Sequence, residues 1–344
     1  MPHLFYDPLV LEHTTGHHPE CPDRLTTVID HLHRRGLGDL LRCPAPHVSI
    51  RTDLERVHQP AYLAGLEAQS ARGGGYLTAD TPFGAASMRA AVAGTGCVLS
   101  AVDAVLNDDV TTAFALVRPP GHHAGPDYGM GFCLLNHAAV AARYAQQSES
   151  VQRVLIVDFD VHHGNGTEEV FVRDDSVLFF STHQSPGYPG TGAVRDIGLE
   201  QGQGFTVNIP LEPGTPDSGF ERALDEVLSP AALRYGPDLI VVSAGFDAHW
   251  SNTRYLNSIR MGATVAGFGR WSRQLVELAK HCCDGRIVFT LEGGYDPDAL
   301  AWSVEATIRS CLGELVEDPI GTSGAFMDRS AGVIREARRI HGLH

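Results

Sequence analysis

Five short apolar runs rich in β-branched residues recur along the chain, and longer stretches with helical periodicity separate them. Strands that alternate with helices form βαβ units and build a mostly parallel sheet. The runs are apolar at nearly every position, which is typical of strands covered by helices on both faces. We therefore expect an α/β fold with a central, mostly parallel sheet flanked by helices. The expected strands are 112–117, 154–157, 177–180, 239–242 and 287–291, and the expected helices are 87–106, 137–145, 219–233 and 265–279.

The 344 residues show no Pro- or Ser-rich linker, no repeat of fixed period and no low-complexity tract. Large α/β domains reach this length as one unit, so we predict a single domain over residues 1–344. The triplet Gly73, Gly74 and Gly75 predicts a flexible loop. The polar segment after Gly313 has no clear pattern and receives no assignment.

The charge balance is acidic, with a net charge of −15 from 41 acidic and 26 basic residues. An acidic surface repels nucleic acids and anionic membranes and attracts cations, so we expect no nucleic-acid or membrane partner and favour a cationic substrate. No apolar run approaches the ~18 residues that span a membrane, and the N-terminus lacks a signal-peptide pattern. The seven cysteines form no C-x-x-C pair, which favours reduced thiols and a cytoplasmic location.

Polar clusters follow four of the apolar runs directly, at 118–124, 158–166, 243–249 and 292–295. In an open α/β sheet, ligands bind beyond the carboxyl ends of the strands. Four strand ends that carry His, Asp and Tyr side chains are therefore expected to face one crevice.

Asp158, Asp160 and His162 are spaced by two, which places all three on one face of an extended chain. Burying two carboxylates beside an imidazole is costly unless a cation is present. Asp160 and His162, joined by Asp247 from the next cluster, form an O/N/O set that leaves a coordination position open for water, as catalytic metal sites do. Zn²⁺ is the first expectation and Fe²⁺ also accepts such ligands. The alternative is a loop whose Asp and His side chains only form hydrogen bonds.

His122 and His123 follow a tight Pro-Pro-Gly turn, and paired histidines beside a metal suit proton transfer near neutral pH. Asp158 is expected to orient one imidazole and Asn165 the other, and the histidine that faces neutral Asn165 should be the less basic one. Tyr295, on a Gly-Gly turn, is a candidate donor to a developing oxyanion. The alternatives are further metal ligands or surface histidines, and a packed aromatic for Tyr295.

Together these motifs resemble those of the zinc-dependent histone deacetylase superfamily, which also includes acetylpolyamine amidohydrolases and acetoin-utilisation proteins. The resemblance runs in order from about Tyr6 to Tyr295, and many ordered motifs are far more specific than one alone. Cys21 stands where the family commonly has Arg. The matching stretches are 18–24, 118–124, 129–133, 158–168, 181–183, 188–192, 243–249 and 291–295.

The resemblance implies an arginase-like α/β domain in which Asp160, His162 and Asp247 hold the metal. It also implies that His123 is the general base and acid, that His122 is its electrostatic partner and that Tyr295 binds the carbonyl oxygen.

The resemblance further implies a tunnel for an acyl-lysine-like group with Phe132 and Tyr188 as its walls and Gly131 beside Phe132 in the substrate site. Asp80 is expected to meet the substrate near the rim. A structural K⁺ site is implied at the backbone carbonyls of Asp158, Asp160 and His162 and the backbone of Ser181 and Thr182.

The sequence departs from the family pattern after His249, where an acidic residue, Pro and Leu usually follow. Here the chain has Trp250 to Leu256 and a few extra residues. This segment forms the pocket rim in the families that the chain resembles, so we expect the departure to leave the metal site untouched and to alter substrate choice. Arg254 is expected at the mouth, where it would repel a polycation.

We therefore expect metal-dependent amide hydrolysis that removes an acetyl or other acyl group from an amine, with acetylpolyamine slightly ahead of an acyl-lysine-like substrate. One alternative is a protein lysine deacetylase, and another is a non-catalytic module that binds an acyl ligand. A ureohydrolase of the related arginase fold also stays open, although such sites use two metals bridged by more carboxylates. A homo-oligomer is compatible with the sequence.

Overall fold

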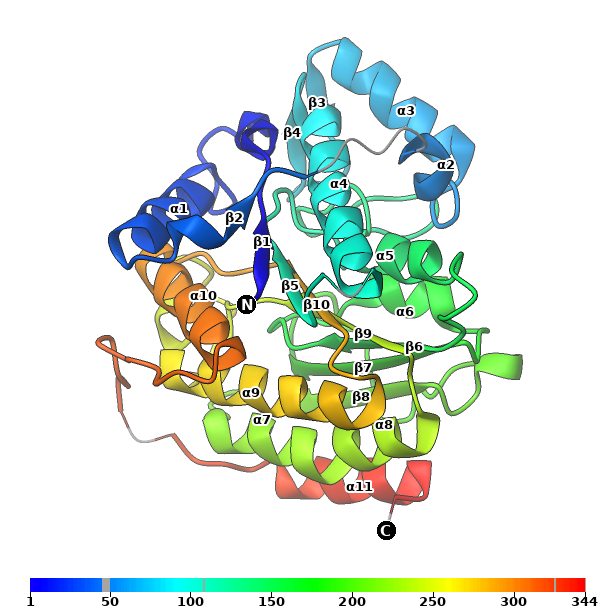
Figure 1. Ribbon diagram of the computed structural model, residues 1–344, viewed down its shortest axis with the longest axis vertical. Helices are drawn as coiled ribbons and strands as arrows, with labels where there is room; N and C mark the ends of the chain where they lie inside the picture. Colours follow the sequence, from blue (N-terminus) through cyan, green and yellow to red (C-terminus); the bar gives the residue numbers. More distant parts are fainter. Residues whose placement is uncertain (45–49, 108, 325, 344) are drawn as a thin grey trace.

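The computed structural model describes residues 1–44, 50–107, 109–324 and 326–343. Its main sheet has eight strands in the order β2-β1-β5-β10-β9-β6-β7-β8, and every neighbouring pair is parallel (Figure 1). The strands are β1 (His3–Phe5), β2 (Leu41–Arg42), β5 (Thr112–Ala115), β6 (Val154–Asp158), β7 (Val177–Gln184), β8 (Thr206–Leu211), β9 (Leu239–Ala244) and β10 (Ile287–Leu291). A second, antiparallel pair consists of β3 (Gly74–Tyr76) and β4 (Pro82–Gly84).

Helices cover both faces of the main sheet (Figure 1). The long helix α4 packs against α5, β1 and β5, while α1, α10 and α9 pack on one another in succession. The last helix, α11, packs against β8 at the sheet edge. The α-helices are α1 (Asp23–Arg34), α2 (Ile50–Leu54), α3 (Pro60–Ala71), α4 (Ser87–Leu106), α5 (His137–Ala145), α6 (Asn165–Phe171), α7 (Asp217–Ala223), α8 (Ser229–Tyr235), α9 (Val265–Cys282), α10 (Pro297–Cys311) and α11 (Ala331–His341).

The central strands β5, β6, β9 and β10 are buried at every position. This burial explains their continuous apolar character, because neither face of the sheet is left to solvent. All five strands expected from the sequence are present, and the α/β fold with a parallel sheet is confirmed. One sheet joins strands from His3 to Leu291, and the single domain over residues 1–344 stays a prediction.

Two local expectations were wrong, and a segment that had received no assignment contains a helix. The glycine triplet is not a free loop, because Gly74 and Gly75 lie in β3 and pair with β4. The segment after Gly313 contains α11, whose buried Ile334 and Ala337 explain why it packs on the sheet edge. The helix expected at 219–233 is divided by a π-helical turn, Leu224–Leu228, just before Pro230. Proline has no backbone N–H to continue the regular helical pattern.

Helix α4 also corrects an expectation, because it is long and apolar enough to cross a membrane by length and composition, with a mean hydropathy of 1.4 in its most apolar window. That window is 67% buried inside the molecule. Helices that are apolar on most sides occur in the cores of large proteins as well as in membranes. The helix is therefore weak evidence for a membrane span.

Candidate metal centre and active site

The four polar clusters lie beside one another, because the strands that precede them, β5, β10, β9 and β6, are consecutive in the sheet. All four strands run parallel, so their carboxyl ends meet at one edge. The predicted convergence of these clusters is therefore what the topology produces.

Asp160, His162 and Asp247 come together at this edge, with potential ligand atoms all within 4.8 Å of one another. Nδ1 of His162 lies 3.1 Å from Oδ1 of Asp160 and 3.2 Å from Oδ2 of Asp247. Backbone amides fix the carboxylates, since Gly293 N donates to Asp160 Oδ2 at 2.9 Å and Val161 N donates to Asp247 Oδ1 at 2.9 Å.

Oδ2 of Asp247 is buried and, among the described residues, receives no hydrogen bond of good geometry. Burial raises the pKa of Asp247, and the nearby negative charge of Asp160 raises it further. Burial alone would lower the pKa of His162, but its close contacts with the two carboxylates raise it to about 9. A divalent cation would neutralise this concentration of negative charge, so the three residues fit the O/N/O donor set of a catalytic metal site.

The two histidines of the dyad have different partners. Nδ1 of His122 lies 2.9 Å from Asp158 Oδ2, and Nδ1 of His123 donates to Asn165 Oδ1 at 2.7 Å. The ring centroids of the two imidazoles are 4.0 Å apart.

The two imidazoles have opposite pKa shifts because their surroundings differ in charge. Burial would lower the pKa of His122, but the charges of Asp158 and Asp160 raise it to about 10. Burial, followed by the neighbouring His122 and His162, holds the pKa of His123 well below its usual value. His123 is therefore neutral beside a charged His122, in the direction predicted from its neutral partner Asn165. Because its Nδ1 donates to Asn165, its Nε2 is the basic nitrogen.

Tyr295 is 4% exposed, and its ring meets Phe132 edge to face with centroids 5.6 Å apart. Burial raises the pKa of its phenol well above the usual value, which keeps the hydroxyl protonated and able to donate. The preceding Gly294 has φ +121, a conformation that L side chains rarely adopt. This turn brings the tyrosine back over the strand ends.

A cavity of about 190 Å³ connects these groups. Tyr188 stands edge to face against His123, with ring centroids 5.2 Å apart. Phe132 has φ +73, which is uncommon for a side chain of this size and marks local strain at the cavity wall. Larger hollows of about 550 and 590 Å³ lie elsewhere, and none of the metal-centre or dyad residues lines them. The cavity is lined by Asp80, His123, Gly131, Phe132, His162, Tyr188, Leu256, Ser258 and Tyr295.

Comparisons with known proteins agree with this geometry. The histone deacetylase domain model matches residues 18–311. The chain belongs to the histone deacetylase domain family. It is 37% identical to "Histone deacetylase 14, chloroplastic" of Arabidopsis thaliana, over 97% of this chain and 83% of that protein. It is 38% identical to a "Probable deacetylase" of Archaeoglobus fulgidus, over 85% of this chain and 80% of that protein.

The solved structure of the HDA15 HD domain superposes with a TM-score of 0.89 and 35% identity, covering 99% of this chain and 95% of that one. The predicted family and its fold are thus confirmed, and deacetylase or amidohydrolase chemistry is the activity of the family to which the chain belongs.

Glu292 belongs to one of the histone deacetylase motifs, but no role was predicted for it. Its Oε2 accepts hydrogen bonds from the backbone N–H groups of Gly121 at 2.6 Å and His122 at 3.2 Å. Ser243 Oγ donates to the other oxygen at 3.0 Å. Glu292 therefore holds the turn that carries the dyad. Its place directly after a strand and before the Gly-Gly turn was the available signal.

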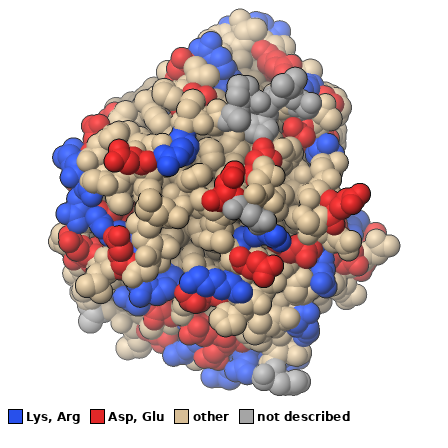
Figure 2. Space-filling model, viewed as in Figure 1, with Lys and Arg blue, Asp and Glu red and all other residues tan. Residues whose placement is uncertain are grey.

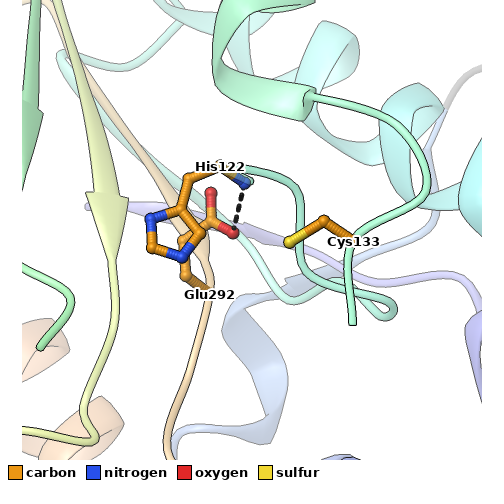
Figure 3. Close-up of side chains that lie close together, drawn as sticks. All are labelled: His122, Cys133 and Glu292. Carbon is orange, nitrogen blue, oxygen red and sulfur yellow. Dashed lines mark hydrogen bonds between the residues drawn. The ribbon is translucent and has the colours of Figure 1, made fainter. Parts of the chain in front are cut away.

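Figure 3 shows Glu292 below the His122 backbone, with Cys133 nearby. These three residues are close enough to suggest a second metal site. However, both Glu292 oxygens already accept hydrogen bonds. Burial also raises the pKa of the Cys133 thiol well above its usual value, whereas a metal requires the thiolate. The cluster is better explained as a hydrogen-bonded support for the dyad.

A buried ion cluster around Glu20, in the N-terminal motif 18–24, is the second feature for which no role was predicted. Glu20 accepts two hydrogen bonds from Arg118, at 2.6 and 2.8 Å, and one from Arg24 at 3.1 Å. Arg24 also donates to the carbonyls of Gly294 at 2.6 Å and Glu292 at 2.5 Å. This cluster ties the start of the chain to the Tyr295 turn, a link that spacing in sequence does not reveal.

The predicted K⁺ ligands lie on neighbouring strands, since Asp158 of β6 is paired with Ser181 of β7. Oγ1 of Thr182 is buried and has no hydrogen-bond partner among the described residues. This side-chain oxygen is not one of the predicted ligands, which are backbone oxygens, so it does not test the K⁺ site. Binding of K⁺ itself stays a prediction.

Part of the divergent segment lies at the cavity, as expected. Leu256 and Ser258 line the cavity. Arg254 is not among the lining residues, and its guanidinium carbon instead lies 5.3 Å from the centroid of the Trp250 ring. Arg254 is therefore not part of the cavity wall, because its exposed side chain stacks on its neighbour.

Proposed function

We propose that this protein is a zinc-dependent deacetylase that hydrolyses the amide of a small acylated amine, with acetylpolyamines slightly ahead of acyl-lysine-like substrates. One observation carries the proposal: a candidate metal ligand, a neutral imidazole and a protonated phenol all line the same narrow cavity. His162, His123 and Tyr295 are those three groups. Amide hydrolysis needs a Lewis acid, a general base and an oxyanion donor within reach of one carbonyl.

The metal, held by Asp160, His162 and Asp247, would polarise the acyl carbonyl and make a water molecule more acidic. Nε2 of His123 accepts the proton of the attacking water, while Asn165 holds Nδ1 and fixes the tautomer. Protonated His122, paired with Asp158, supplies positive charge beside the reacting centre. Tyr295 donates its hydroxyl proton in a hydrogen bond to the oxyanion. His123 then gives its proton to the leaving amine, so that acetate and a free amine are formed.

The walls favour a thin substrate. Phe132 and Tyr188 are aromatic, and a cavity of about 190 Å³ accommodates an acetyl group on an alkyl linker better than a bulky acyl amide. Asp80 adds a carboxylate to the lining, which suits a cationic amine. The guanidinium of Arg254 stacks on Trp250 and does not line the cavity, which weakens the objection to a polycation.

The net charge of −15 also favours a cationic amine by electrostatic steering. Figure 2 shows acidic and basic side chains interspersed on one face of the molecule, so the charge does not gather there as a single acidic patch. Steering is therefore expected to be modest on that face.

The second candidate is a protein lysine deacetylase, which the name of the Arabidopsis thaliana relative, "Histone deacetylase 14, chloroplastic", favours. A silent acyl-binding module has no use for Tyr295 beside an intact dyad. A two-metal ureohydrolase is disfavoured because the second cluster, around Glu292, is better explained as a support of the dyad.

We also propose a structural K⁺ beside Asp158, a cytoplasmic location and a homo-oligomeric assembly. The free state of all seven cysteines is consistent with a reducing compartment.

The test compares kcat/KM for acetylputrescine, acetylspermidine and an acetyl-lysine peptide at low and high salt, with the zinc-loaded protein. We expect acetate release from all three, a modest preference for the polyamines and a decline with salt, because screening weakens steering. A strong peptide preference that ignores salt would favour the second candidate. No acetate release from any acetylated amine would contradict the proposed reaction.

A further inference from the structure

Asn252 lies within the divergent segment, in the 3₁₀ helix Trp250–Arg254, and is only 1% exposed. Neither the metal centre nor the dyad accounts for a buried amide at this place. A buried polar side chain is retained at low cost only when its hydrogen bonds are satisfied.

The amide of Asn252 makes four hydrogen bonds. Its oxygen accepts from the backbone N–H groups of Tyr295 at 2.7 Å and Asp296 at 3.0 Å. Its nitrogen donates to the backbone carbonyls of Phe246 at 3.2 Å and His249 at 3.3 Å. Only an amide offers an acceptor to one side and two donors to the other. A carboxylate would place a charged oxygen against two carbonyl oxygens.

These partners belong to two different parts of the active site. Phe246 and His249 flank the metal ligand Asp247, whereas Tyr295 carries the oxyanion donor. Other contacts hold the Tyr295 turn before the tyrosine, through Gly293 N to Asp160 at 2.9 Å and Gly294 O to Arg24 at 2.6 Å. Asn252 is the contact that reaches the N–H of Tyr295 itself.

From this geometry we infer that Asn252 is a positioning residue, which sets the backbone of Tyr295 relative to the Asp247 loop and thereby aims the phenol at the reacting carbonyl. The inference rests on the proposed function, because it assigns the role through Tyr295. One side chain of the divergent segment therefore also bonds the backbone on both sides of Asp247.

The kinetic test uses Asn252→Asp, which keeps the shape and the acceptor but removes both donors. We expect kcat to fall about 10- to 100-fold, because misplacing one catalytic group by ~1 Å costs on that scale. KM should change less than about threefold, since Asn252 does not line the cavity. The matched control is Asn107→Asp, which adds the same charge at an exposed position after α4 that does not line the cavity, and it should leave both constants unchanged.

A double-mutant cycle separates positioning from general destabilisation. If Asn252 acts through the phenol, Asn252→Asp should have little further effect in the Tyr295→Phe background, because the group that it positions is already gone. Two losses that multiply would overturn the inference. If Asn252→Asp fails to fold, Asn252→Ser, which buries no charge, carries the same cycle.

Hydrogen exchange gives a readout that needs no activity. In the variant, the amides of Tyr295 and Asp296 should exchange faster, whereas β7 (Val177–Gln184) should not change. Unchanged exchange at residues 295–296 together with unchanged kcat would overturn the inference. If the wild-type protein hydrolyses no acetylated amine, the proposed function fails, and the exchange of these two amides still decides whether Asn252 holds the Tyr295 backbone.

Discussion

The floor and the rim of the same cavity are built in different ways. The floor consists of Asp160, His162 and Asp247, which follow the ends of buried parallel strands. Backbone amides such as Gly293 N hold its carboxylates in place. The lining part of the rim comes from Leu256 and Ser258, beyond the short 3₁₀ helix. Gln184 holds this part, through the Ser258 carbonyl at 2.9 Å and the Arg260 N–H at 2.7 Å.

This difference teaches which part of the site sets the reaction and which part sets the substrate. The floor has many mutually dependent contacts, so a change there disturbs the chemistry. Leu256 and Ser258 belong neither to the candidate metal ligands nor to the dyad, so a change there alters mainly what can enter. Asn252 is the exception, because it belongs to the divergent segment but its side chain is hydrogen-bonded to the Tyr295 turn.

The largest effect is expected at the metal centre. Asp160→Ala, His162→Ala and Asp247→Ala should each abolish tight metal binding and activity, because two ligands hold a divalent ion poorly. Elemental analysis of the purified variants measures the loss, with Asp30→Ala on the exposed face of α1 as the control. Full metal occupancy in any of the three would remove that residue from the ligand set.

The oxyanion donor should come next. Tyr295→Phe is expected to fold normally, to keep its metal and to lose about 100-fold in turnover, the usual scale for one such donor. Steady-state kinetics on the best substrate gives the value. Near-normal turnover would mean that Tyr295 is only a packed aromatic ring.

A smaller effect is expected in the pH dependence of stability, through the buried carboxyl of Glu292. Burial raises the pKa of Glu292 to about 7, above the value of about 4.5 in the unfolded chain. As pH rises between these values, the unfolded state releases this proton first, so the carboxyl makes the folded state less stable across pH 4.5–7. The size is on the order of 3 kcal/mol.

The check is the free energy of unfolding of metal-free wild type and Glu292→Gln as a function of pH. Their difference should shift in favour of the variant as pH rises through this window, since Gln does not titrate. A difference that stays constant from pH 4.5 to 7 would show that Glu292 has an ordinary pKa.

The smallest effects are expected in the rim. Leu256→Ala widens the cavity entrance and should raise KM by a few fold without changing metal content. Arg254→Ala should change kcat/KM less than twofold, because that side chain stacks on Trp250. Competition between acetylspermidine and an acetyl-lysine peptide measures both. A large loss of kcat in Leu256→Ala would mean that the rim takes part in the chemistry.

The sequence predicted which side chains meet at the floor, because their residue types are chemically distinctive. Asp160, His162 and Asp247 follow buried strands, and their potential ligand atoms do come together, while the metal itself stays a prediction. The expected helices 87–106 and 137–145 and the strand 287–291 agree with the observed bounds. Continuous apolar patterns explain this agreement.

Other features depend on tertiary partners and carry no local signal. β1 and β2 have three and two residues, too few to show a period. β8, at the sheet edge, includes Asn208 and Pro210, which interrupt an apolar pattern. Glu292 and Asn252 are ordinary polar residues in sequence, and their roles arise only from backbone groups that folding brings to them.

The central claim is that one catalytic metal ion, held by the floor, drives amide hydrolysis. The most direct measurement determines zinc content per chain alongside acetate release as the metal-free protein is titrated with Zn²⁺. The account predicts that activity on an acetylated amine rises in proportion to zinc and reaches its plateau at one ion per chain. Activity that needs two ions per chain, or that is complete without added metal, would contradict it.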